Sequence, residues 1–86
     1  MTVARVKTYR GISTRAAVHY LTRIGGTQIN DRTVRGDGWS ASVSADTVQI
    51  GPSLELTEVT VRFEGEPEVL EPLIEAFSQK AIRAGG

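Results

Sequence analysis

The sequence predicts a two-layer α+β fold, with one antiparallel sheet and two helices packed on the same face of it. Two segments show helical periodicity, and the rest of the patterned chain alternates in the manner of strands. The connections between the middle strands are short, and parallel neighbours would need long crossovers. The order along the chain is strand, helix, about four strands, helix. Packing both helices on one sheet face buries every apolar stripe in a single core.

The first strand and the first helix are predicted from residues 2–24. Residues 2–9 alternate, with Ala4, Val6 and Thr8 on one face and charged residues on the other, so we expect Val6 to enter the core. Ser13 is a predicted N-cap, because its side-chain oxygen can accept from a free amide of the first helical turn. The helix should run from about residue 14 to residue 24. Glycines 25 and 26 should end it.

The middle of the chain is predicted to be all strand. Residues 27–35 should contain a bulge or turn near Asp31-Arg32, because their apolar residues are out of phase. A tight turn is expected at residues 36–38. The clearest alternation follows, with a buried face formed by Trp39, Ala41, Val43 and Ala45 and a wet face formed by Ser40, Ser42 and Ser44.

The next segment is predicted to be interrupted twice. Asp46 should turn the chain, and residues 47–51 should form a short strand with Val48 and Ile50 inward. The phase of the apolar residues then changes near Thr57-Glu58, which predicts a bulge or a bent strand. The outer face of the sheet is expected to be polar, carrying Ser40, Ser42, Ser44, Thr47, Gln49, Thr60 and Arg62.

The last helix should begin at residues 65–67, since proline is favoured at the first helical position. Its apolar stripe comprises Leu70, Leu73, Ile74, Phe77 and Ala81. We therefore expect one shared core under the two helices, containing Val6, Leu21, Val43, Val61, Leu73 and Phe77.

Composition narrows the classes of function. The 86 residues include ten Lys plus Arg, ten Asp plus Glu and no cysteine. Without cysteine the chain can form neither disulfides nor thiolate metal sites. A net charge of zero argues against a nucleic-acid binder, and the sequence has no apolar run that could cross a membrane. We expect a single cytoplasmic domain over residues 1–86, without enzymatic activity, metal or cofactor, that does not bind nucleic acid or membranes.

Two features are candidate functional sites. The chain ends in Gly85-Gly86, and sulfur carriers and ubiquitin-like modifiers end in two glycines because a narrow adenylating site admits only an unbranched tail. A plain helix stop is the alternative. Trp39 is the other candidate, either as the cap of the core or as a contact with a protein partner. The single histidine, His19, has no neighbours at the spacing of a metal site.

Three stretches carry a resemblance to a known family: residues 36–44 (GDGWSASVS), 48–65 (VQIGPSLELTEVTVRFEG) and the closing residues 67–86. Together they resemble the C-terminal domain of proteins related to the small subunit of molybdopterin synthase, a domain of unknown function. The resemblance implies a layout like that of TATA-binding proteins, with strand, helix, four strands and helix. In those proteins a ubiquitin-like sulfur-carrier domain precedes this one, and these 86 residues show no such domain.

The function that we expect is therefore that of an accessory domain. It would bind a protein partner, and the resemblance links that partner to molybdenum-cofactor or sulfur-transfer proteins. Two alternatives stay open at this point: a sulfur carrier or protein modifier that uses Gly86, and a module that associates with itself as a homo-oligomer.

Overall fold

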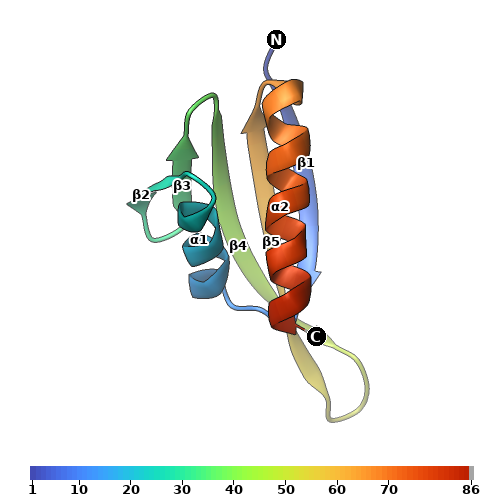
Figure 1. Cartoon of the computed structure of the whole chain (residues 1–86). Helices are drawn as coiled ribbons and strands as arrows, with labels where there is room; N and C mark the ends of the chain where they lie inside the picture. The colour runs from blue at the N-terminus through green and yellow to red at the C-terminus, as the bar shows by residue number, and fades with distance from the viewer. Residues whose placement is uncertain (86) are drawn as a thin grey trace.

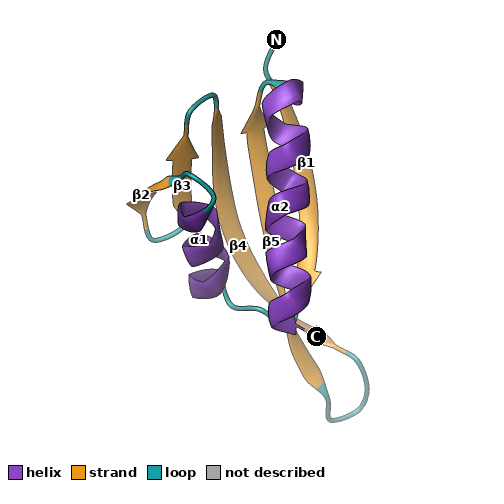
Figure 2. Ribbon diagram, viewed as in Figure 1, coloured by secondary structure: helices purple, strands orange, loops and turns teal. Residues whose placement is uncertain are grey.

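The computed structural model describes residues 1–85 and has the predicted order of elements. Figure 1 shows the strands and helices along the chain, and Figure 2 colours them by type. The elements are β1 (Val3–Arg10), α1 (Thr14–Arg23), β2 (Thr27–Asn30), β3 (Thr33–Gly36), β4 (Trp39–Gln49), β5 (Glu55–Gly65) and α2 (Pro67–Gly85).

The strands form one antiparallel sheet in the order β1-β5-β4-β3-β2. The first strand pairs with the last, so β1 lies at one edge of the sheet and β2 at the other. The α+β class and the antiparallel sheet are thus confirmed. The closer likeness to TATA-binding proteins stays a prediction.

The local signals around α1 are also confirmed. Ser13 precedes the helix, and its Oγ accepts a hydrogen bond of 3.0 Å from the backbone N–H of Ala16. The chain leaves the helix through Gly25, whose φ of +110° is strained for any residue with a Cβ. Strands β2 and β3 are separated by the expected turn at Asp31-Arg32.

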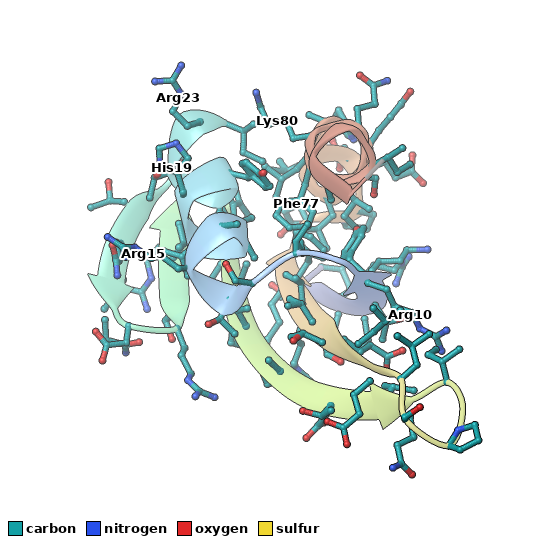
Figure 3. The ribbon with its side chains drawn as sticks, turned by 90° about the horizontal axis from the view of Figure 1, so that it is seen from below. Arg10, Arg15, His19, Arg23, Phe77 and Lys80 are labelled. Carbon is teal, nitrogen blue, oxygen red and sulfur yellow. The ribbon has the colours of Figure 1, made fainter. Side chains whose placement is uncertain are left out.

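Both helices cover the same face of the sheet (Figure 3), and the core lies between them and the strands. Phe77 of α2 occupies its centre and points toward the sheet. Its ring makes edge-to-face contacts with Tyr9, Phe63 and Tyr20, at centroid distances of 5.0, 5.7 and 6.4 Å. The buried residues are Ile12, Ala17, Val18, Leu21, Val34, Trp39, Ala41, Val43, Val59, Val61, Phe63, Leu70, Leu73, Phe77 and Ala81.

The predicted burial of Val6 is wrong. Its side chain is 57% exposed and lies on the sheet face that the helices leave open. Tyr9 decides the phase of β1, because its ring packs on Phe77 and its hydroxyl hydrogen-bonds to Ser78 Oγ at 2.8 Å. By alternation, Val6 then faces the opposite way.

The two interruptions predicted in β4 and β5 are also wrong. Asp46 does not turn the chain, and neither strand is bulged: their pairing is continuous from Trp39↔Gly65 to Gln49↔Glu55. Consequently Val48 lies on the open face rather than in the core, and Ile50 is exposed, while Thr47 and Gln49 lie on the face of Trp39 and Val43. The physical reason is that the hairpin continues beyond the helices, so its apolar residues no longer need to face them (Figure 1).

Within residues 1–85, no helix is long and apolar enough to cross a membrane.

Candidate interaction surface

The β4–β5 hairpin extends beyond the rest of the molecule as an arm, which we define as residues 46–58. Strand β1 ends where Arg10 pairs with Glu58. Strands β4 and β5 stay paired beyond that point, as far as Gln49↔Glu55, and are then joined by a loop. Figure 1 shows the arm reaching past the ends of both helices and of β1. Among the elements formed by residues 1–85, none covers either face of the arm.

Four aliphatic side chains gather on one face of this arm. Val48 and Leu56 are cross-strand partners, and the backbone N–H of Ile50 donates to the carbonyl of Leu54 at 2.8 Å, which closes the hairpin. Ile50, Leu54 and Leu56 are 46%, 56% and 38% exposed. We call Val48, Ile50, Leu54 and Leu56 the aliphatic cluster. Grouped apolar side chains in contact with water are typical of a binding surface, whereas scattered ones are not.

The aliphatic cluster lies on the open face of the sheet. Side chains alternate along a regular strand, and the even-numbered residues of β4, such as Ser42 and Ser44, are exposed while Ala41 and Val43 are buried. Val48 is also even-numbered, so the aliphatic cluster lies on the same face of the sheet as these serines. Val6, on β1, lies on the same face.

Charged and small polar groups follow the cluster on this open face, from the base of the arm toward the rest of the sheet. A salt bridge joins Arg10 Nε to Glu58 Oε2 at 3.1 Å at the base of the arm, and another joins Arg62 Nε to Glu64 Oε1 at 2.9 Å. Between them is a shallow hollow of about 290 Å³ lined by Val6, Ser42, Val43, Ser44, Thr60 and Arg62. Apolar side chains bordered by polar and charged groups are common at protein interfaces, and here the polar border lies on the side of the cluster nearest the sheet.

The predicted polar outer face is confirmed for Ser40, Ser42, Ser44, Thr60 and Arg62, but it is wrong for Thr47 and Gln49, which lie on the opposite face. Sequence reasoning missed the aliphatic cluster beside the serines. The signal was present in the sequence. The apolar residues change phase at Asp46 in one strand and at Glu58 in the next, and these two residues pair with each other. The two strands therefore change phase at the same level of the hairpin. Beyond this level the helices no longer cover the sheet, and the apolar side chains lie on the open face.

Trp39, the candidate partner contact, is only 7% exposed. Its indole fills space at one end of the core next to the backbone of Gly26 and Gly36. A hollow of about 320 Å³ lies beside it, lined by Thr2, Arg35, Gly36, Gly38, Ser40, Glu64 and Gly65 together with the tryptophan itself. Nearly the whole surface of the ring is thus in contact with the core of this chain. A contact between Trp39 and a partner stays a prediction.

A second polar surface lies on α1. Arg15, His19 and Arg23 follow one another at intervals of four residues and project from the outer side of the helix (Figure 3). A hollow of about 430 Å³ opens beside them, lined by Thr14, Arg15, Val18, His19, Thr22, Gln28 and Asp31. In the part of the chain that the structure describes, no group of three or more His, Asp or Glu side chains could hold a metal ion.

The diglycine candidate is only half within the described residues. Helix α2 spans Pro67–Gly85, so Gly85 is its last residue, and Gly86 lies outside the described part of the chain. Use of this terminus in conjugation therefore stays a prediction.

The comparisons with known proteins agree with the resemblance noted from the sequence. Residues 5–86 match the family described as archaeal MoaD-like protein. No curated protein matches the chain. Because the match covers nearly the whole length of the sequence, the chain belongs to the archaeal MoaD-like family.

Proposed function

We propose that this chain is an accessory domain without enzymatic activity, which binds a protein of the molybdenum-cofactor or sulfur-transfer machinery through the aliphatic cluster on its arm. The observation that carries the proposal is the placement of Val48, Ile50, Leu54 and Leu56 together on an uncovered face. Membership of the MoaD-like family supports the class of partner.

The energetics of such a contact are favourable. Burying an aliphatic side chain stabilises a complex by roughly 1.5–3 kcal/mol relative to leaving it exposed. The arm also offers these side chains on a regular hairpin, whose backbone is already ordered before binding. Less conformational entropy is then lost on association than with a flexible loop.

Binding of the purified full chain to two candidate partners would test the proposal: the large subunit of molybdopterin synthase and an adenylating enzyme of sulfur transfer, both from the same organism. Leu54→Ser should weaken binding to the true partner about tenfold or more, because it removes a side chain that we place at the contact. Ile29→Ser is the matched control, since Ile29 is 54% exposed on β2, far from the arm in the sheet order. Equal affinities for the wild type and Leu54→Ser would contradict the proposal.

The alternative function, a sulfur carrier or modifier, is tested in the same assay. Deleting Gly85 and Gly86 should leave accessory binding unchanged, with at most a few tenths of a kcal/mol lost through fraying of α2. A carrier would instead lose its reaction with ATP and the adenylating enzyme. A thiocarboxylate or an isopeptide bond at Gly86, found by mass spectrometry of protein from native cells, would favour that second function.

A further inference from the structure

The outer edge of β4 is unpaired along the arm. Strand β3 pairs with β4 only as far as Thr33↔Ser42, and the last contact is the hydrogen bond from Val43 N–H to the carbonyl of Arg32, at 2.8 Å. The backbone groups of a strand point alternately to its two sides. The backbone N–H and C=O groups of Val43 point away from β5, so the same groups of Ala45, Thr47 and Gln49 also point away from it. They form a row of donors and acceptors for which the described residues supply no partner strand.

We propose that two copies of this chain pair through these edges, with the β4 strands antiparallel and a twofold axis at Gln49. Each Gln49 would donate its N–H to the carbonyl of the other, and Thr47 would lie opposite Gly51 of the second copy. An antiparallel edge that pairs with itself satisfies both copies at once, which is the requirement of a closed twofold dimer. The two five-stranded sheets would become one continuous sheet with the arms at its centre.

The aliphatic cluster selects this register. With the axis at Gln49, Val48 lies directly opposite Ile50 of the second copy, and this happens twice across the axis. Directly opposed side chains are the strongest cross-strand pairs of a sheet. Moving the axis to Val48 or Thr47 would place the carboxylate of Asp46 opposite Ile50 or Val48 of the second copy. An axis at Thr47 would also bring the loop of the second arm against the turn at Asp31-Arg32.

Charge permits the same register. The run from Thr47 to Leu54 contains no charged residue, and Asp46 and Glu55 flank it. With the axis at Gln49, the two Asp46 residues are six strand positions apart, about 20 Å. This exceeds the screening length of about 8 Å at physiological salt, so the two carboxylates do not oppose pairing.

The edge also lacks the features that keep exposed strands apart. Natural edge strands are often protected by proline, by lysine or another charged residue, or by a bulge. Residues 45–49 of β4 contain neither proline nor lysine, and their pairing with β5 is regular. The one charged residue of this segment, Asp46, lies outside the proposed contact between Val48 and Ile50. The end of the edge at Gly51 is uncrowded, because, apart from its two chain neighbours, the described residues place no atom within 4 Å of the position that a Cβ there would occupy. Pairing would join the two aliphatic clusters into one surface, and it does not depend on the accessory function proposed above.

Two matched proline variants test the pairing by analytical ultracentrifugation. Thr47→Pro removes an N–H that points to the outer edge of β4, and Glu55→Pro removes one that points to the opposite edge of the arm. The opposite edge is identified by Thr57, whose carbonyl accepts from Gly11 N–H on the β1 side. Neither N–H belongs to the β4–β5 ladder, because Thr47↔Thr57 and Gln49↔Glu55 are non-hydrogen-bonded pairs. We expect dimers for the wild type and Glu55→Pro, and monomers for Thr47→Pro with an unchanged circular dichroism spectrum.

Amide hydrogen exchange of the wild type gives a second test that needs no folded variant. Exchange at Thr47 and Gln49 should slow about tenfold or more as the protein concentration rises from low micromolar to submillimolar, while exchange at Glu55 should not change. A wild type that stays monomeric with rapidly exchanging Thr47 and Gln49 amides would overturn the proposal. So would loss of the dimer in both proline variants alike. Failure of the accessory function would give a different result: Leu54→Ser would leave the affinity for the partner unchanged, while the dimer would still form.

Discussion

The indole of Trp39 lies directly against the backbone of Gly36, where a Cβ would overlap the ring atoms Nε1 and Cε2. The two residues flank the turn between β3 and β4, and they pair across it. The tryptophan therefore closes one end of the core only because residue 36 has no side chain. A turn glycine has in this case a packing role as well as a conformational one.

Replacing Gly36 with alanine should lower the free energy of unfolding by roughly 1–3 kcal/mol, because the added methyl group displaces a rigid ring in a packed core. Chemical denaturation with circular dichroism detection measures the change. Gly51→Ala is the control: nothing lies within 4 Å of its added methyl group, so its stability should stay within about 0.5 kcal/mol of the wild type or rise slightly. Equal effects of the two variants would contradict the packing role.

Truncating Phe77 to alanine should cost roughly 3–5 kcal/mol of stability. This ring is fully buried and contacts Tyr9, Tyr20 and Phe63, so its removal opens a cavity between both helices and the sheet. Ile82→Ala, on the exposed side of the same helix, should change stability by no more than about 0.5 kcal/mol. A loss of only about 0.5 kcal/mol for Phe77→Ala would mean that α2 does not pack as described.

Val6 and Val61 test the phase of β1. Val61 is fully buried, so Val61→Ala should cost about 2 kcal/mol through lost burial and the cavity that remains. Val6→Ala should cost no more than about 0.5 kcal/mol, because that side chain lies on the open face. Thermal unfolding of the two variants side by side distinguishes the two phases, and a larger loss at Val6 would reverse our assignment.

Tyr9 should make stability fall at alkaline pH. Burial raises the pKa of its hydroxyl, and this effect outweighs the hydrogen bond to Ser78, which lowers the pKa. The folded protein thus holds a proton that the unfolded chain releases near pH ~10. The stabilisation is fully present below that pH and is lost as the pH rises through the higher folded pKa. Denaturation as a function of pH should show a shallower alkaline loss for Tyr9→Phe than for the wild type; identical slopes would count against this origin.

Local chemistry accounts for most of the predicted fold. Ser13 and Gly25 set the two ends of α1. The side-chain oxygen of Ser13 caps the first turn, and Gly25, which has no Cβ, lets the chain leave the last one. The alternation from Trp39 to Ala45 predicts its buried face correctly, because Trp39, Ala41 and Val43 are apolar and the residues between them are serines. In both cases the decisive interactions involve near neighbours in the chain.

The sequence by itself thus determined the order of elements, the antiparallel sheet and the turns at residues 31–32 and 36–38, but not the turn expected at Asp46. Only the tertiary structure decided which face of β1 and of the arm is buried. Strand β1 has apolar and polar residues on both faces, and Tyr9 fixes its phase by meeting Phe77, 68 positions later in the chain. The arm shows the same dependence. Val48 is half-buried and Leu56 is exposed although both are apolar, because they lie on the sheet face opposite to the one that α1 and α2 cover. Alternation along a strand indicates that its two faces differ. Which face is buried depends on the elements that cover it, and these elements are formed by residues distant in sequence.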